Sequence, residues 1–482
     1  MVFSSPIFLF GFLPLVLLFY YLSPRWLRNG MLLLASILFY AWGEGFYVAV
    51  MLVSILLNYV SGLLLDGARQ QGRQGLARFW LGLGVGLNVA LLISFKYANF
   101  IADNLSVLTR ALGMGEIELA PVHLPLGISF FTFQAISYLV DVYRREVSCQ
   151  RNLWNLALYI SLFPQLIAGP IVRYHDIAAQ IRDRAHSLEL FASGVQRFVQ
   201  GLAKKVLIAN PLGEVADTAF ALNDAELTLP LAWIGILAYG LQIYFDFSGY
   251  SDMAIGLGRM FGFRFLENFN YPYIARSLRE FWRRWHISLS TWFRDYVYIP
   301  LGGSRVPTWR VYVNLFLVFM LTGFWHGASW NFLVWGLSHG LFLAAEHAGF
   351  SGVLARWWRP LQHIYLLLVV TFTWVFFRAD TLPQSLDYLG AMVGLSGVAT
   401  DSLSYHRLLS VEALLAFAAG AVLTMPVYAV LRERLRVWTD NHAERQLLFY
   451  QLPRIGLMGL LWFVCLLKVS ASTYNPFIYF RF

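Results

Sequence analysis

The residue with the clearest capacity for chemistry is a histidine inside an apolar stretch. Residues 311–345 contain no charged side chain, yet Trp325-His326-Gly327 lies among them and His339 follows. Lipid cannot satisfy the donor and acceptor of an imidazole, so such a ring must face a protein interior or a watery cavity. Near neutral pH a neutral imidazole can take a proton from an attacking hydroxyl group. His326 is therefore a candidate general base, with a structural histidine that joins two helices as the alternative.

The residues next to His326 suit that role. Trp325 can cover the imidazole, and Gly327 lets a second backbone or a substrate approach closely. For His339 we expect the usual role of an isolated buried histidine, which is to hold two helices together by hydrogen bonds. The sequence contains no Ser-His-Asp order, glycine-rich phosphate loop or nucleophile elbow, which argues against a covalent hydrolase or a kinase.

A second candidate segment, from Arg279 to Tyr296, is rich in basic and aromatic residues. If it forms one helix, it has a cationic face and an aromatic face. The first face holds Arg279, Arg283, His286 and Ser290, and the second holds Leu278, Phe281, Trp285, Trp292 and Tyr296. The helix either lies in the lipid headgroups or lines a cavity in which arginines bind a phosphate beside His286.

Two carboxylates, Asp246 and Asp252, end an apolar stretch. Buried carboxylates are costly unless they are paired, so they either pair with nearby arginines or orient a catalytic group. The histidines show no metal-site spacing. Cys149 and Cys465 lie far apart and form neither a disulfide framework nor a thiolate motif. We expect no metal.

The composition indicates an all-α polytopic membrane protein. Of 482 residues, 58% are hydrophobic and 13% are charged, whereas soluble domains contain about 25% charged residues. The apolar runs are continuous and long enough to span a membrane, unlike the short alternating strands of a barrel. The net charge of +9 fits basic cytoplasmic loops better than nucleic-acid binding.

Basic residues also set the predicted orientation. Arg25 and Arg28 follow the first apolar stretch and none precedes it, so this stretch is no signal peptide and the N-terminus is expected outside. We predict about 11 full crossings, at roughly 20 residues each. The apolar stretches are about 8–22, 31–48, 50–65, 79–95, 124–140, 154–172, 190–207, 229–247, 253–263, 311–324, 332–345, 364–377, 408–427 and 455–469.

The stretch 154–172 breaks the alternation of basic loops, because Arg151 and Arg173 flank both of its ends. It contains Pro164 and Gly169, where a helix can turn back. A re-entrant element and a proline-kinked span both fit this pattern. Residues 379–407 are the one polar stretch after the core and are expected to form a loop.

These motifs, in the order in which they occur, resemble those of the membrane-bound O-acyltransferase (MBOAT) superfamily. Within it, the chain is most similar to the bacterial proteins that acetylate polysaccharides. The resemblance covers essentially the whole chain, less clearly beyond Arg378. The matching segments are Trp325-His326-Gly327, Glu280–Tyr296, Val2–Ser5, Phe95–Phe100, Pro125–Phe130, Phe163–Pro170, Tyr244–Gly256 and Pro476–Phe480.

The resemblance implies a single membrane domain, residues 1–482 with a core of about 95–380, built as a helical bundle around a central tunnel. It implies that His326 is the principal catalytic histidine and His286 the second. It also implies an acyl donor, acetyl-CoA or an acyl-carrier thioester, that acts as substrate and not as a bound cofactor. The acceptor is then a hydroxyl of an exported polymer such as alginate, reached directly or through a partner.

The expected setting is the bacterial inner membrane, with the N-terminus periplasmic. The expected partners are the lipid bilayer, a periplasmic SGNH-type acetyltransferase and a cytoplasmic acyl carrier. The candidates for substrate or donor binding are Arg279, Arg283, Arg284, Asp246, Asp252, Trp325 and Asn314, with the Lys204-Lys205 pair as a further phosphate contact. Teichoic-acid D-alanyl transfer shares both histidine motifs and stays open, as do a transporter and a structural scaffold.

Overall fold

Every regular element in the part of the chain that the structure describes is helical. The computed structural model describes residues 1–223, 225–396, 408–439, 446–471 and 474–476. The helices are α1 (Leu13–Leu22), α2 (Arg28–Glu44), α3 (Val48–Gln70), α4 (Gln74–Leu92), α5 (Ala98–Ala111), α6 (Ile128–Arg144), α7 (Leu153–Ser161), α8 (Phe163–Leu166), α9 (Tyr174–Arg182), α10 (Leu188–Ala203), α11 (Asn210–Phe220), α12 (Leu229–Met260), α13 (Leu278–Trp282), α14 (Ile287–Phe293), α15 (Thr308–His326), α16 (Trp330–Ala345), α17 (Ser351–Leu354), α18 (Arg359–Arg378), α19 (Leu382–Met392), α20 (Val411–Leu423), α21 (Val427–Thr439) and α23 (Leu452–Ala471). This confirms the all-α prediction.

Several helical stretches are suited to a bilayer. Within the described residues, 5 stretches are long and apolar enough to cross a membrane: 25–70, 74–111, 229–260, 359–378 and 446–471. The bent pair α20 and α21, with 61° between its halves, adds one more if it is a single span. Large apolar side chains such as Leu34, Leu415 and Phe463 are exposed on these helices, as expected of surfaces that contact lipid.

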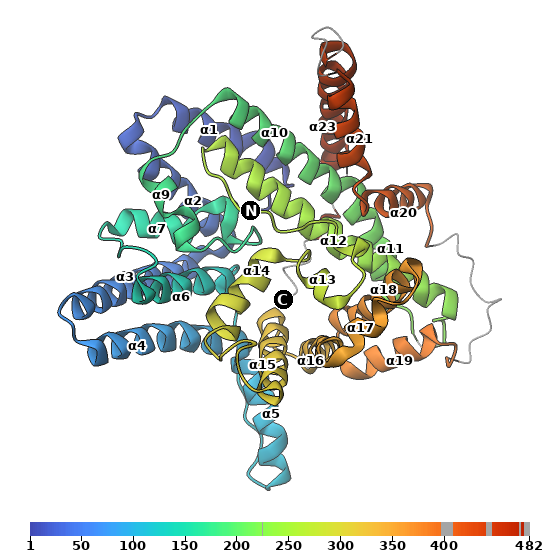
Figure 1. Ribbon diagram of the computed structural model, residues 1–482, viewed down its shortest axis with the longest axis horizontal. Coiled ribbons are helices and arrows are strands. Elements are labelled where there is room, and N and C mark those ends of the chain that lie inside the picture. Colours follow the sequence, from blue (N-terminus) through green and yellow to red (C-terminus); the bar gives the residue numbers. More distant parts are fainter. Residues whose placement is uncertain (224, 397–407, 440–445, 472–473, 477–482) are drawn as a thin grey trace.

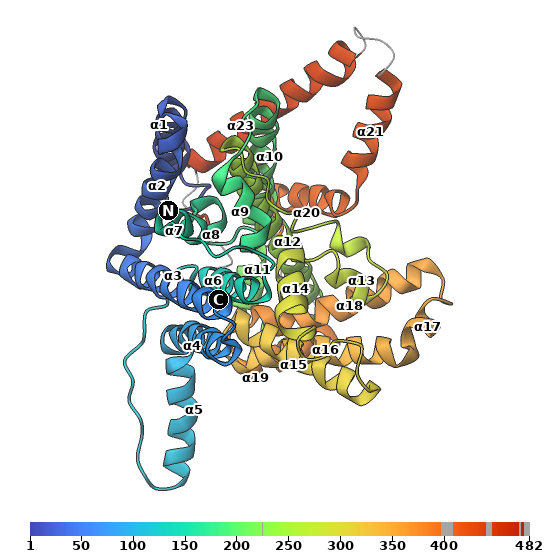
Figure 2. The same ribbon diagram turned by 60° about the vertical axis from the view of Figure 1, so that its left-hand side comes forward.

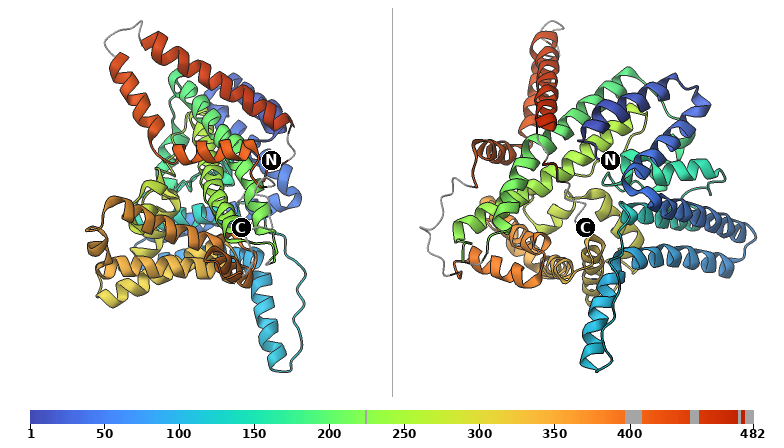
Figure 3. Two further views of the ribbon diagram at one scale, coloured as in Figure 1. Left: turned by 90° about the vertical axis from the view of Figure 1, so that its right-hand side faces the viewer. Right: turned by 180° about the vertical axis from the view of Figure 1, so that it is seen from behind.

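The helices surround a central region that contains short elements. In Figure 1, α13 and α14 lie near the middle of the view, between α6, α12, α15 and α18. Trp292 of α14 stacks on Phe133 of α6 at 3.7 Å between ring centroids, and Trp285, in the link between α13 and α14, lies 5.2 Å from Trp374 of α18. Helix α5 and the α21–α23 pair project from opposite ends of the molecule (Figures 2 and 3).

Two helix pairs make backbone contact through glycines. A Cβ added to Gly256 of α12 would lie 2.6 Å from the carbonyl oxygen of Gly194 in α10, and one added to Gly194 would lie 2.7 Å from that of Gly256. In α15 and α16, a Cβ on Gly323 would collide with the Phe332 carbonyl, and one on Gly336 with the Phe319 carbonyl. Small residues allow this approach where no hydrophobic effect drives helices together.

Two predicted elements are wrong. The apolar stretches 229–247 and 253–263 belong to one continuous helix, α12, because the buried segment between them keeps helical geometry. The segment 279–296 is not one helix, since α13 ends at Trp282 and His286 has a left-handed backbone with φ of 43°. Asn268 causes the break by accepting bonds from the backbone of Ile287 and Ser288. The expected single cationic face therefore does not exist.

The stretch 154–172 is broken as the proline predicts. Helix α7 ends at Ser161, α8 starts at Phe163, and residues 167–173 are non-helical. Side chains from Leu156 to Val172 are all buried, which is the setting in which irregular backbone is tolerated at membrane depth. The predicted loop 379–407 contains α19, and its residues 397–407 lie outside the described residues.

The glycine contact between α10 and α12 yields a stability prediction. Gly256→Ala should lower the free energy of unfolding by about 1–3 kcal/mol, because the new methyl group overpacks against backbone that cannot rotate away. The measurement is thermal unfolding in detergent. Gly86→Ala in α4, where a Cβ meets nothing within 4 Å, is the matched control and should leave stability equal or raise it by up to about 1 kcal/mol. Equal melting temperatures for both variants would contradict the prediction.

Candidate active site

His326 lies at the point where α15 ends inside the protein. Its side chain is 5% exposed. The ring packs edge-on against Trp335 at 5.1 Å and Phe377 at 4.9 Å, and Trp325 covers another side at 4.9 Å. The backbone then leaves the helix at Gly327 in an extended conformation. Aromatic rings hold the imidazole on several sides while the end of the helix brings it to a cavity wall.

His286 lies on the other side of Trp325. The ring centroids of His286 and Trp325 are 6.0 Å apart, so the indole contacts both histidines. His286 is 0% exposed, and neither of its ring nitrogens has a hydrogen-bond partner among the residues that the structure describes. Its positive φ costs about 1–3 kcal/mol in a non-glycine residue. Backbone strain and unsatisfied buried polar atoms both concentrate at functional sites.

A cavity of about 390 Å³ reaches His326. Met1, Lys96 and His326 line it together with His123, whose side chain is 51% exposed and bonded to Glu44 at 3.0 Å. The imidazole of His326 is thus buried in aromatic packing and yet borders a space open to small molecules. A group in such a place can exchange a proton with a substrate and is shielded from bulk solvent.

A second cavity of about 380 Å³ lies beyond the end of α15. Gly327, Ser329 and Phe377 line it, together with the ion pair between Arg378 and Asp217 at 2.6 Å. Lys96 and Leu124 line both cavities. The last turn of α15 and the residues after it therefore stand between two neighbouring spaces.

The two predicted carboxylates are engaged with basic side chains. Asp246 pairs with Lys205 at 2.7 Å, and the two side chains are 0% and 3% exposed. Asp252 pairs with Arg197 at 2.6 Å and with Lys204 at 2.7 Å. Both carboxylates are therefore paired with basic side chains, as the structural alternative predicted, although two of the partners are lysines and not arginines. A role of either carboxylate in substrate binding stays a prediction.

The remaining predicted binding residues are spread over the fold. Arg279 and Arg283 are exposed, whereas Arg284 bonds to Glu280 at 2.8 Å. Asn314 is buried and donates to the carbonyls of Leu301 and Gly303, each at 3.3 Å. Of the predicted set, the structure brings together His326, Trp325 and His286.

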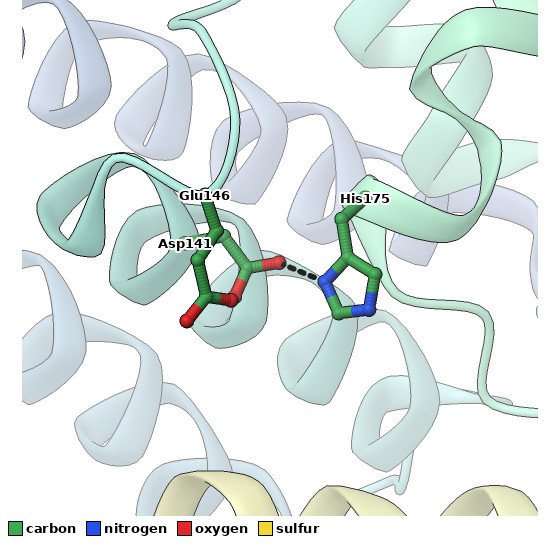
Figure 4. A group of neighbouring side chains, drawn as sticks. All are labelled: Asp141, Glu146 and His175. Carbon is green, nitrogen blue, oxygen red and sulfur yellow. Dashed lines mark hydrogen bonds and ion pairs between the residues drawn. The ribbon is translucent and has the colours of Figure 1, made fainter.

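One cluster has the composition of a metal site but the bonding of an ion-pair network. Asp141 on α6, Glu146 just after it and His175 on α9 have ligand atoms within 4.8 Å of one another (Figure 4). His175 bonds through Nδ1 to Asp141 at 2.8 Å and through Nε2 to Asp176 at 3.2 Å. The hydrogen bond to Asp141, and to a smaller extent the one to Asp176, raises the pKa of His175 to about 9. A protonated imidazole donates from both nitrogens and has no lone pair for a metal.

The sequence analysis did not identify Lys96 as a site residue. Its Nζ lies 3.2 Å from the His326 carbonyl oxygen and 2.5 Å from that of Trp325. The sequence feature that could have indicated Lys96 is a lysine inside a stretch apolar enough to cross a membrane, residues 74–111. Such a lysine is costly unless its charge is compensated. Its partners are carbonyls more than 200 residues away, which no local pattern reveals.

Comparison with known proteins bears on what this site does. The profile of the membrane-bound O-acyltransferase family matches residues 144–382. The chain is 44% identical to probable alginate O-acetylases AlgI of Azotobacter vinelandii and of Pseudomonas putida, with 100% of each chain covered. It is 38% identical to a peptidoglycan O-acetyltransferase of Helicobacter pylori, over 84% of this chain and 82% of that one.

The buried ion pair predicts a large stability effect for one substitution. Asp246→Asn removes the only negative charge of the pair and leaves Lys205 buried in the protein, which should lower the free energy of unfolding by about 3–5 kcal/mol. Chemical denaturation in detergent measures it. Glu433→Gln, in an exposed pair with Arg436, is the control and should change stability by at most about 1 kcal/mol. A similar small effect for both variants would refute the prediction.

The His175 network predicts a pH dependence. The pKa of His175 is about 9 when folded, against 6.5 as its ordinary value. Because the folded state binds this proton more tightly than the unfolded state, the His175 network contributes its full stabilisation below about pH 6.5. The contribution is lost as the pH rises through about 9. The melting temperature should therefore fall between pH 7 and pH 9.5, and His175→Gln should flatten this fall. His347→Gln, at an exposed histidine, should keep the wild-type slope; an equal slope in all three proteins would be the contrary result.

Proposed function

Because the chain belongs to the membrane-bound O-acyltransferase family, we propose that it passes an acetyl group from a cytoplasmic thioester to a hydroxyl group on the outer side of the bacterial inner membrane. The protein is a multi-pass membrane O-acyltransferase. The identity to probable alginate O-acetylases along the whole chain supports an exported polysaccharide such as alginate as the final acceptor. The observation that carries the proposal is that His326, on the wall of a cavity, is buried among aromatic rings.

In the proposed reaction the imidazole of His326 accepts the proton of an incoming hydroxyl group. The hydroxyl oxygen attacks the thioester carbonyl carbon, a C–O bond forms, the C–S bond breaks, and the imidazolium returns the proton to the leaving thiolate. Burial in an aromatic environment favours a neutral imidazole before reaction, because a buried unpaired cation is costly. His286 acts from the far side of Trp325 as the second functional histidine.

The topology that this function needs is part of the proposal. One membrane domain, residues 1–482, crosses the bilayer about 11 times, with a re-entrant element near α7–α8 and the N-terminus in the periplasm. A tunnel joins the cytoplasmic donor, acetyl-CoA or an acyl carrier, to His326. The cavity at Glu44 and His123 is the opening toward the acceptor, where a periplasmic SGNH-type acetyltransferase receives the acetyl group if transfer is relayed.

The donor side has its own candidates. Arg279 and Arg283 are exposed, and neither forms an ion pair among the described residues, although Arg279 Nη2 lies 3.5 Å from His347 Nδ1. Their guanidinium groups can therefore meet the phosphates of a thioester donor. Arg284 is engaged with Glu280, and Lys204 with Asp252. This difference ranks Arg279 and Arg283 above the other basic candidates.

The decisive experiment replaces the candidate base. His326→Ala should lower the acetyl-ester content of the exported polymer by about 10²–10⁴-fold, the usual contribution of general acid–base catalysis. Acetyl esters are quantified per amount of membrane-inserted protein. His339→Gln is the matched control. His339 is also buried, and its one hydrogen bond among the described residues comes from Trp282 Nε1 at 3.3 Å, which an amide oxygen can accept in its place.

The outcomes separate the proposed function from its competitors. Undiminished acetylation by a folded, inserted His326→Ala protein would reject the catalytic role and favour a scaffold. Transfer from a D-alanyl carrier but not from acetyl-CoA, in inverted membrane vesicles, would assign D-alanyl transfer to the same histidine. Uptake of the acetylated substrate without ester formation would identify a transporter.

A further inference from the structure

The element between α4 and α5 places a lysine at the end of α15. Residues Ile93–Tyr97 form η4, a π-helical turn. Such turns often occur at functional sites, because the extra residue redirects the side chains that follow. Lys96 lies in this turn, within an apolar stretch where an ammonium group is costly unless all its donors are bonded.

The turn supplies donors to carbonyl groups that α15 cannot satisfy. The last four carbonyls of an α-helix lack intrahelical partners. Here the Tyr97 hydroxyl donates to Phe324 O at 2.7 Å, and Lys96 Nζ donates to Trp325 O at 2.5 Å and to His326 O at 3.2 Å. The Gly323 carbonyl accepts from Gly327 N at 3.3 Å. All four carbonyls at this end, including the one of the candidate base, are therefore bonded.

We propose that Lys96 is a positioning residue for His326: its ammonium closes the end of α15 and so fixes the direction of the imidazole at the cavity wall. A cation at a helix C-terminus is favoured by the exposed carbonyls and by the helix dipole. Beyond His326 the backbone is extended at Gly327, so no further helical turn holds the histidine. Lys96 takes the place of that turn.

The bonding of Lys96 distinguishes positioning from catalysis. An ammonium group has three donors and no acceptor. Two of these meet Trp325 O and His326 O, and the third meets Ser129 Oγ at 3.4 Å. The group is therefore committed to the protein, although its side chain lines both cavities. It holds the segment between the two cavities and is not a free cation for a substrate phosphate.

This inference rests on the proposed function only in that His326 performs the chemistry. Lys96→Met keeps the length of the side chain and removes its charge and donors. The expected result is a kcat about 10–100-fold lower, because a small misplacement of a catalytic group is enough to cause such a loss, with KM for acetyl-CoA changed less than about twofold. Amide hydrogen exchange should accelerate at residues 324–329 and not elsewhere. Lys468→Met, at a lysine with 41% side-chain exposure on α23, is the control.

A chemical rescue tests the same point on one folded preparation. Lys96→Cys is purified and then aminoethylated with 2-bromoethylamine, which rebuilds an ammonium group at nearly the original position. The native Cys149 and Cys465 are both buried, and treated wild-type protein controls for their modification. We expect aminoethylation to restore kcat to within about fivefold of wild type and to slow exchange at residues 324–329 again, as positioning requires.

Three outcomes overturn the proposal. The first is a wild-type kcat in Lys96→Met while His326→Ala is inactive. If both variants stay active, the result instead counts against the proposed function. The second is a fully aminoethylated Lys96→Cys protein without gain in kcat. If neither Lys96→Met nor Lys96→Cys accumulates, Lys96→Arg, which keeps the charge, is tested in their place. The third overturning outcome is then a lost kcat in Lys96→Arg with unchanged hydrogen exchange at residues 324–329. A retained kcat supports positioning.

Discussion

The site depends on a helix that ends inside the protein. Helix α15 ends at His326, a residue that is 5% exposed, so bulk water does not satisfy its last carbonyls. A buried unsatisfied polar group costs about 1–3 kcal/mol, so this end forms only if donors reach it from elsewhere in the fold. Tyr97 and Lys96 are those donors. The same interruption that creates the need for donors also lets the residues after His326 line the second cavity while Trp325 and His326 line the first.

The aromatic residues around this end explain how a polar centre persists in an apolar interior. Trp325 lies against both His326 and His286, while Trp335 and Phe377 enclose the first imidazole. Aromatic rings exclude water and offer partially positive edges and negative faces to polar neighbours. The packed rings therefore keep both imidazoles in place within the apolar interior.

Local pattern was enough to predict the helical class, because charge-free stretches and the positions of basic residues carry that information along the chain. The family followed from the resemblance of motifs in their order, and the role of Trp325-His326-Gly327 stays a prediction. The interruption at His286 was missed because Asn268 produces it by bonding to the backbone of residues 287 and 288, a contact with no local signature. The same holds for Lys96, whose partners come from α15. Helix α12 was divided in the prediction because its polar segment around Asp246 and Asp252 resembles a loop until Lys205 and Arg197 neutralise it.

The glycine contacts have a consequence for how the molecule moves. In α10–α12 and in α15–α16 the backbones touch with no side chain between them, so neither pair can slide or separate without losing that fit. Each pair behaves as a rigid unit. The ring of His286, at a left-handed turn, contacts Phe247 of α12 and Trp325 of α15, so this residue joins one rigid pair to the other.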